Sequence, residues 1–190
     1  MQISIFDLEV NNIKSICNAA KLFGEVNIVK NLKQFKKADV IILPGNGSFD
    51  TAMKVLNENS LSKIINDYFY ENKKIIGICL GLQLFMTSSE EGSSKGLNLI
   101  KGKTIKIKNK SIKTPMLGWY DVSFKNNYFK NNNFFFNNNY MVSPEEDSCV
   151  VGYMEDIPVF VQKKKFTGLQ FHPEKSSEYG LELLKKIILD

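Results

Sequence analysis

The fold is decided by the stretch Lys73-Lys74-Ile75-Ile76-Gly77-Ile78-Cys79-Leu80-Gly81-Leu82-Gln83-Leu84-Phe85. Its first half is an apolar run typical of a strand that is covered on both faces, and its second half can begin an apolar helix. The pattern changes at a cysteine with a glycine two residues before it and another two residues after it. Side chains at those two positions would collide across a sharp strand-to-helix turn. The stretch therefore predicts a nucleophile elbow that carries Cys79.

A thiol at such an elbow would lie at a helix N-terminus, where unpaired N–H groups and the helix dipole favour the thiolate. The alternative is a buried structural cysteine beside a strand, which is a common place for this residue type. The pentapeptide from Gly77 to Gly81 leaves both interpretations open.

The composition is that of a globular protein, with 43% hydrophobic and 24% charged residues among 190. This length suits a single domain, residues 1–190. No apolar run approaches the ~20 residues that span a membrane, so we expect a soluble, cytoplasmic protein with no membrane partner. The net charge of +5 comes from lysine, because the chain has no arginine. Nucleic-acid sites depend on the arginine fork, so we expect no nucleic-acid partner.

The three cysteines, Cys17, Cys79 and Cys149, show no CxxC spacing. They predict neither a disulfide framework nor a zinc site, and free thiols agree with a reducing compartment. We expect no metal and no cofactor.

Strands alternate with helices through the first half of the chain. Strands are expected at residues 3–6, 25–29, 38–43 and 74–78, and helices from Asn11 or Asn12 to about Phe23, from Phe49, and over 61–72. This order indicates right-handed βαβ units and a parallel sheet, with ligands bound beyond the carboxyl ends of its strands. The turn Pro44-Gly45-Asn46-Gly47 and Cys79 both follow strands, so they should face the same crevice.

The second half changes to successive strands, expected at residues 99–100, 104–107, 120–124, 140–142, 149–153, 159–161 and 167–171. We expect these to be antiparallel, either extending the sheet or forming a small second layer. Residues 125–139 are rich in asparagine, lysine and phenylalanine, and we favour a variable surface loop over a binding loop there. A final helix is expected over 177–189. The predicted fold is α/β, a mostly parallel central sheet flanked by helices, with antiparallel strands in the second half.

The chain has one histidine, in Gln170-Phe171-His172-Pro173-Glu174-Lys175-Ser176. Proline favours an extended residue before it, and in an extended segment His172 and Glu174 share a face. A thiol nucleophile needs a base to carry its proton, and a carboxylate can orient that base. The alternative is a surface His-Pro turn beside an unrelated glutamate, but the cysteine elbow elsewhere in the chain favours a catalytic pair.

A thiolate that attacks a carbonyl also needs hydrogen-bond donors for the oxyanion. The N–H of Leu80, directly after the nucleophile, is one candidate. The Pro44–Gly47 loop is the other, because its glycines let the backbone approach a substrate closely. An ordinary strand-to-helix turn is the alternative for that loop.

Three stretches in this order, Pro44-Gly45-Asn46-Gly47-Ser48-Phe49, Gly77–Gln83 and Gln170–Ser176, resemble the class I (triad-type) glutamine amidotransferases. The resemblance implies their flavodoxin-like fold, with Cys79 as nucleophile, His172 as general base and acid, and Glu174 as its orienting partner. It implies that Gly45, Gly47 and Leu80 serve the oxyanion and that Gln83 contacts the substrate, glutamine. Catalysis would pass through a γ-glutamyl thioester and would release ammonia and glutamate.

Within the family, the chain is most similar to glutaminase subunits that pass ammonia to a (β/α)8-barrel synthase subunit of histidine biosynthesis. Trp119 and Lys175 would then lie toward the partner in a heterodimer. A paralogue that supplies ammonia for amidino groups of surface sugars is the alternative. Two segments depart from the family pattern: residues 114–120 lack its histidine, and residues 141–145, matched to its Phe-Val-His-Ser-Tyr stretch, carry Pro144 where a glutamine-binding Ser or Thr is expected.

Two other classes of function stay open at this point. A stand-alone cysteine hydrolase would cut peptides or γ-glutamyl chains without a partner, although the compact length leaves no substrate domain. A non-catalytic binding subunit would keep the shape alone, although the set of Cys79, His172 and Glu174 argues against it.

Overall fold

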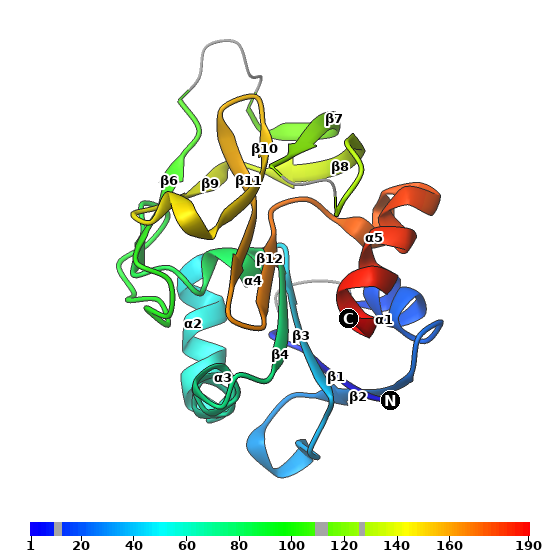
Figure 1. Ribbon diagram of the computed structural model, residues 1–190. Coiled ribbons are helices and arrows are strands. Elements are labelled where there is room, and N and C mark those ends of the chain that lie inside the picture. Colours follow the sequence, from blue (N-terminus) through cyan, green and yellow to red (C-terminus); the bar gives the residue numbers. More distant parts are fainter. Residues whose placement is uncertain (10–12, 109–113, 126–127) are drawn as a thin grey trace.

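A nine-stranded sheet runs through the computed structural model, which describes residues 1–9, 13–108, 114–125 and 128–190 (Figure 1). The strand order is β2-β1-β3-β4-β12-β11-β10-β7-β8. The strands of the first half pair in parallel, as predicted. They are β1 (Gln2–Phe6), β2 (Glu25–Val29), β3 (Val40–Gly45) and β4 (Lys74–Cys79). β3 extends through Pro44 and Gly45, so the predicted turn begins two residues later than expected.

Strand β12 (Phe166–Leu169) pairs in parallel with β4, so the expectation of antiparallel pairing for residues 167–171 is wrong on this side. Its other neighbour, β11 (Ile157–Lys163), is antiparallel to it. All four residues of β12 are buried, which is the pattern of a strand covered on both faces. The pairing continues the parallel half of the sheet by one strand.

The other strands of the second half pair as antiparallel neighbours, as predicted. In the large sheet they are β10 (Val150–Met154), β7 (Met116–Phe124) and β8 (Asn132–Asn138). A separate three-stranded sheet holds β5 (Ser88–Ser89), β6 (Gly102–Lys106) and β9 (Tyr140–Pro144), in which β5 and β6 are parallel. Residues 99–100 form a buried bend and no strand.

Strand β8 lies inside residues 125–139, where a surface loop was expected, so that prediction is wrong. Phe134 and Phe136 are fully buried, while Phe135 between them points to the other face. Because residues 134–136 are all phenylalanine, the sequence does not show this alternation between buried and exposed positions. Because alternate residues of a strand face opposite sides, only the first and third of them enter the core.

Helices cover both faces of the sheet (Figure 1). α1 (Lys14–Ala20) and α5 (Ser177–Leu189) pack on one face, and α2 (Phe49–Glu58) and α3 (Leu61–Tyr70) on the other. The short elements are α4 (Leu80–Gln83) and the 3₁₀ turns η1 (Leu32–Gln34), η2 (Asp147–Cys149) and η3 (Pro173–Lys175). None of the helices in the described ranges is long and apolar enough to cross a bilayer.

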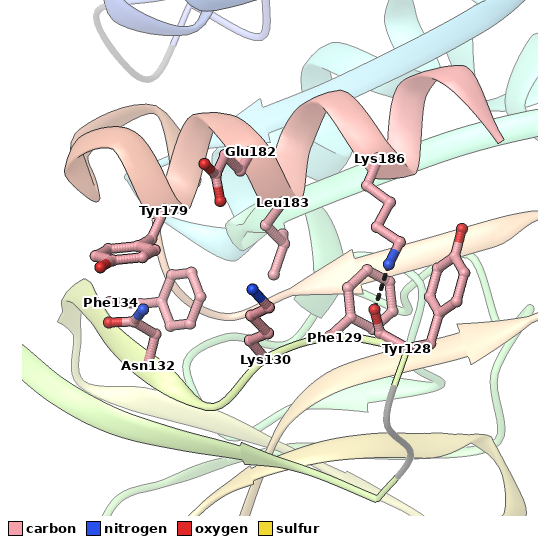
Figure 2. Close-up of a pocket in the computed structure, with 9 residues that line it drawn as sticks. All are labelled: Tyr128, Phe129, Lys130, Asn132, Phe134, Tyr179, Glu182, Leu183 and Lys186. Carbon is pink, nitrogen blue, oxygen red and sulfur yellow. Dashed lines mark hydrogen bonds between the residues drawn. The ribbon is translucent and has the colours of Figure 1, made fainter.

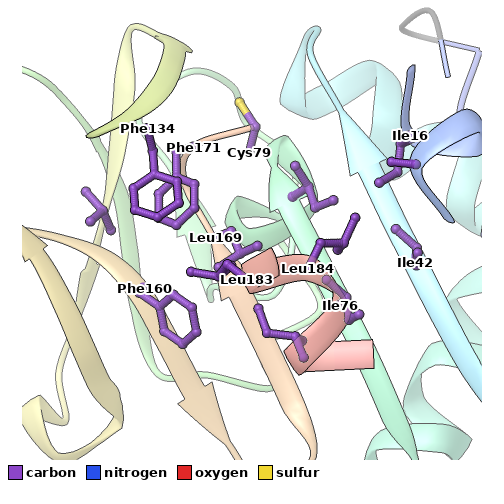
Figure 3. Close-up of a cluster of buried hydrophobic side chains, with 14 of the residues drawn as sticks. Ile16, Ile42, Ile76, Cys79, Phe134, Phe160, Leu169, Phe171, Leu183 and Leu184 are labelled. Carbon is purple, nitrogen blue, oxygen red and sulfur yellow. The ribbon is translucent and has the colours of Figure 1, made fainter. Parts of the chain in front are cut away.

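Helix α1 is shorter than predicted. It ends at Ala20, and Leu22, which the predicted helix included, is 66% exposed. The predicted capping residues, Asn11 and Asn12, lie outside the described residues. On the α1 and α5 face, buried Leu183 and Leu184 belong to the same hydrophobic cluster as Phe171 and Cys79 (Figure 3). The nucleophile candidate is thus held over a packed core.

Candidate active site

Cys79 occupies a strained turn at the carboxyl end of β4. Its backbone has φ 54° and ψ −109°, a conformation that residues other than glycine rarely adopt. A Cβ on Gly81 would stand 1.7 Å from Leu43 O, and one on Gly77 would stand 2.8 Å from Gly81 O. The prediction that this turn requires both glycines is confirmed.

The helix after Cys79 is much shorter than the sequence suggested. α4 contains four residues, so its aligned peptide dipoles are few and its effect on the thiol is small. Cys79 does precede the N-terminus of a helix, as predicted, but that helix is only four residues long. The charge that stabilises the sulfur has to come from a side chain.

His172 is brought to Cys79 by the parallel pairing of β12 with β4. Leu169 lies opposite Ile78 in this register, so the residues that follow both strands emerge at the same edge of the sheet. His172 is 4% exposed, and its backbone N–H donates a hydrogen bond to Phe135 O at 2.8 Å. Its Nδ1 lies 2.9 Å from Glu174 Oε1. The structure thus brings the three predicted catalytic residues together.

The imidazole is held in its charged form. Burial by itself lowers the pKa of His172, but its interaction with Cys79 and its hydrogen bond with Glu174 outweigh burial and raise the pKa to about 10. Within the described residues Nε2 of His172 has no hydrogen-bond partner, and the larger part of its interaction with Cys79 is Coulombic. A cationic imidazole beside a cysteine is the arrangement that favours a nucleophilic thiolate.

A polar pocket of about 250 Å³ opens on Cys79. Of the predicted substrate residues, Gly47, Leu80 and Gln83 line it, together with Asn46, Glu91 and residues 137–140. Gly45 does not line this pocket. It lies opposite Cys79 in the sheet, where a Cβ on residue 45 would stand 2.7 Å from Leu80 Cβ. Gly45 instead lines a second cavity of about 200 Å³, together with His172 and Glu174. The close packing with Leu80 explains why residue 45 is a glycine.

A chain of buried amides connects the pocket wall to the sulfur. Gln83 Nε2 donates to Tyr140 O and to Gln170 Oε1, both at 3.2 Å, and Gln170 Nε2 donates to Cys79 Sγ at 3.7 Å. Gln170 is fully buried, and sequence reasoning assigned it no role. The signal that could have found it is a glutamine inside an apolar strand, two residues before the only histidine.

The turn from β8 to β9 forms one wall of the pocket. Asn137 O lies 3.8 Å from Cys79 Sγ, and residues 138–140 follow along the wall. Residues 141–145, which sequence matching placed at the glutamine pocket, instead pair with β6, with Pro144 opposite Gly102. That placement is wrong by a few residues, because the strand that faces Cys79 is β8.

Glu91 is a second pocket residue to which the sequence analysis assigned no role. Its Oε2 accepts a hydrogen bond from the N–H of Phe49 at 3.1 Å. Burial raises the pKa of this carboxyl, while the hydrogen bond from Phe49 opposes the shift. The only signal in the sequence was a pair of glutamates before Gly92.

Trp119 and Lys175 lie apart from the pocket, on the outer face of the sheet. The Trp119 and Phe135 rings pack edge-to-face, with 6.1 Å between their centres, and Lys175 Nζ lies 5.9 Å from the centre of the Phe135 ring. Leu117 and Trp119 are 60% and 52% exposed. We call Leu117, Trp119, Phe135 and Lys175 the outer patch.

A further cavity of about 230 Å³ lies between α5 and residues 128–134 (Figure 2). Tyr179, Glu182 and Lys186 of α5 face Lys130 and Phe134 across it. Cys79, His172 and Glu174 do not reach this cavity, so the chemistry belongs to the pocket at the strand ends.

Comparison with known proteins agrees with this geometry. Residues 4–190 match the family model "Glutamine amidotransferase class-I". The chain belongs to this family. The predicted family and the predicted fold are both confirmed.

Sequence relatives of this amidotransferase include the imidazole glycerol phosphate synthase subunit HisH of Oceanobacillus iheyensis, 38% identical over 97% of this chain and 96% of that protein. The subunit of the same name from Methanocaldococcus jannaschii is 37% identical, with 98% of each chain covered. Among solved structures, "Crystal structure of glutamine amidotransferase" superposes with a TM-score of 0.82 at 16% identity, covering 98% of this chain and 97% of that one. PurLQS from Thermotoga maritima gives 0.77 at 20% identity with the same coverage. At these identities the structures establish the shared fold.

Proposed function

We propose that this amidotransferase is the glutaminase subunit of an imidazole glycerol phosphate synthase in histidine biosynthesis. The observation that carries the proposal is the strained Cys79 at a polar pocket, beside a cationic His172 that is paired with Glu174. Relatives that carry the name of that synthase subunit, with nearly full-length coverage, support the pathway.

In the first half-reaction, the Cys79 thiolate attacks the side-chain carboxamide carbon of glutamine and forms a C–S bond. The oxygen gains negative charge, and the N–H groups at Leu80 and Gly47, which line the pocket, are the proposed donors to it. His172 gives its proton to the leaving nitrogen as the C–N bond breaks. The products are ammonia and a γ-glutamyl thioester on Cys79.

In the second half-reaction, neutral His172 takes a proton from water, which attacks the thioester carbon. The C–S bond breaks, glutamate leaves, and the Cys79 thiolate and protonated His172 are restored. Glu174 stays ionised throughout and stabilises the imidazolium through the 2.9 Å contact. Each residue thus returns to its starting state.

Glutamine enters the pocket as a zwitterion, so the pocket needs a partner for its α-ammonium. Glu91 is the acidic side chain that lines the pocket within the described ranges. We propose that it pairs with this ammonium, because an opposite charge close to a buried carboxylate offsets the cost of burial.

The outer patch is the proposed contact with a (β/α)8-barrel synthase subunit. Exposed aromatic and apolar side chains beside a cation are typical of the centre of a protein–protein interface. Phe135 belongs to the patch, and Asn137, two residues along the same strand, contacts Cys79. Ammonia would therefore be released close to the partner.

We also propose that residues 1–190 act as one domain, since strands from both halves of the chain share the nine-stranded sheet. We expect a cytoplasmic enzyme, since Cys17, Cys79 and Cys149 are all free thiols.

The test is a glutaminase assay of the chain alone, with the barrel synthase subunit, and with that subunit plus its ribonucleotide acceptor. We expect glutamate release to rise when the partner is added and again when the acceptor is added. A Cys79→Ala variant, in the same complex, should release none. Stimulation by a sugar amidotransferase in place of the histidine-pathway subunit would contradict the proposed pathway but not the glutaminase chemistry.

A further inference from the structure

Gln170 carries a fully buried side-chain amide directly after β12, next to the nucleophile. Its backbone N–H donates to Val159 O at 2.9 Å, which ties this position to β11. Its Oε1 accepts a hydrogen bond from Gln83 Nε2 at 3.2 Å, and its Nε2 donates to Cys79 Sγ at 3.7 Å. A buried amide costs free energy unless its polar atoms are paired. Both ends of this side chain are paired, and one of them is paired with the reacting atom.

The orientation of the Gln170 amide is fixed by a carbonyl at the other end of the hydrogen-bonded chain. Tyr140 O can only accept, so Gln83 presents its NH₂ group there, at 3.2 Å. The same NH₂ group also donates to Gln170, which therefore turns its oxygen toward Gln83. A rotated Gln170 amide would place two NH₂ groups against each other. The NH₂ group of Gln170 consequently faces the sulfur of Cys79.

A donor at this position acts on the charge of Cys79. An N–H group bonds a thiolate more strongly than a neutral thiol, because hydrogen bonds to charged acceptors are the stronger ones. Asn137 O, which lies 3.8 Å from the sulfur, is an acceptor and disfavours a thiolate. The helix after Cys79 has only four residues, so few peptide dipoles are aligned toward the sulfur. The Gln170 amide therefore supplies a donor that the backbone around the sulfur provides only weakly.

We propose that Gln170 is a further catalytic residue, whose side-chain N–H stabilises the thiolate of Cys79. The inference rests on the proposed glutaminase function and deepens it. The thiolate occurs twice in the cycle, before it attacks the carboxamide carbon and again when the C–S bond of the thioester breaks. At both points the amide donates a hydrogen bond and keeps its proton, so no covalent bond of Gln170 forms or breaks.

The experiment follows alkylation of Cys79 by iodoacetamide in the full chain, with mass spectrometry of the labelled peptide. The rate is measured between about pH 4 and about pH 9, the range in which activated and ordinary cysteines ionise. Gln170→Met removes the donor without adding a charge, and Gln83 keeps its other acceptor, so this variant should fold. Gln170→Glu keeps the shape and places a carboxylate beside the sulfur. Gln162→Glu, on β11, where the side chain bonds Thr167 Oγ1 at 3.3 Å, is the matched control.

We expect the pH of half-maximal alkylation to rise by about one in Gln170→Met, which is about a tenfold loss of thiolate below that pH. It should rise further in Gln170→Glu, because a like charge disfavours the thiolate. The plateau rate at alkaline pH should change little, and the control should follow the parent. A lower plateau with an unmoved midpoint in Gln170→Met would overturn the inference and restrict Gln170 to a structural role. A profile equal to that of the parent would also overturn it.

A measurement on the intact Gln170 covers the case in which its substitution unfolds the chain. The side-chain NH₂ resonance of Gln170 should shift in Cys79→Ala, while that of Gln162 should not. An unmoved Gln170 resonance would overturn the inference. Alkylation requires no glutamine, so glutamate release by the parent, measured separately, tests the glutaminase function by itself.

Discussion

Glu174 Oε1 lies 2.9 Å from Nδ1 of His172, and only 7% and 5% of the two side chains is exposed. This contact fixes the imidazole so that its other nitrogen, Nε2, is the one that serves Cys79. Glu174→Gln keeps the shape but removes the charge that stabilises the imidazolium. We expect kcat for glutamine to fall by about a hundredfold or more, with a small change in KM.

Steady-state glutamate production is the measurement for this variant. Glu178→Gln, on the exposed first turn of α5, is the matched control and should keep full activity. A Glu174→Gln enzyme with normal kcat would show that the carboxylate has no part in orienting the base.

The single histidine makes the charge state of the site directly observable. Its NMR titration should report His172 alone, with a pKa of about 10. Cys79→Ala removes one of the two interactions that raise this pKa, so the midpoint should move down. Cys149→Ala, at another buried free thiol, should leave it in place. An unchanged midpoint in Cys79→Ala would contradict the ion pair.

The same ionisation links stability to pH. The folded pKa of about 10 lies above the ordinary value of 6.5, so the folded state binds the proton more tightly than the unfolded state. The stabilisation is complete below about pH 6.5 and is lost as the pH rises through about 10. Urea unfolding of the parent should show this decline between those pH values, and Cys79→Ala should show less of it.

The elbow was predictable from sequence because its constraint is local. The glycines two residues before and after Cys79 carry the signal, and Gly77 is required by Gly81 within the turn itself, although Gly81 also has to avoid Leu43 O on the neighbouring strand β3. The position of His172 was harder to predict, because it depends on β12 pairing in parallel with β4, between residues that are 91 positions apart, such as Ile75 and Phe166. Apolar alternation does not specify the direction of a neighbouring strand.

The pocket wall was missed for a related reason. β8 looks like low-complexity sequence, and its register is fixed by burial of Phe134 and Phe136 and by pairing with β7, which are long-range contacts. The same uncertainty placed the glutamine-pocket stretch on residues 141–145, which belong to the smaller sheet. The place of Glu91 in the pocket became evident only once that wall was known.

Gly81→Ala should unfold the elbow. A methyl group at this position would stand 1.7 Å from Leu43 O, a backbone atom of a central strand that cannot move without disturbing the sheet. We expect a loss of more than about 3 kcal/mol in the free energy of unfolding, measured by urea denaturation. Gly118→Ala is the comparison, because its nearest neighbour is 4.0 Å away and only its φ of 140° is unfavourable. Gly81 has no unfavourable φ of this kind, so a loss no larger than that of Gly118→Ala would contradict the predicted clash with Leu43 O.

Ser176 should prove to be a positioning residue for His172. Its hydroxyl donates to His172 O at 2.6 Å and accepts from the N–H of Phe135 at 2.9 Å, and the side chain is fully buried. Ser176→Ala leaves the Phe135 N–H unpaired, so we expect a loss of about 1–3 kcal/mol in stability. The histidine segment would also be held less firmly, so kcat should fall several-fold while KM stays nearly constant. Ser177→Ala, at the exposed next position, is the control. A stability loss with unchanged kcat would restrict Ser176 to a structural role.

Trp119 should be needed for the partner and dispensable for the pocket. Its side chain is 52% exposed and contacts Phe135 on the outer face of the sheet. Trp119→Ala should weaken association with the barrel subunit by at least about tenfold, since buried tryptophans at interface centres commonly contribute 2 kcal/mol or more. Binding of L-glutamine to the isolated chain should be unaffected. Tyr70→Ala, an aromatic residue 69% exposed on α3, is the control for nonspecific loss of an exposed ring. Titration of the partner against each variant gives the affinities, and equal effects of the two substitutions would exclude the outer patch as the docking surface.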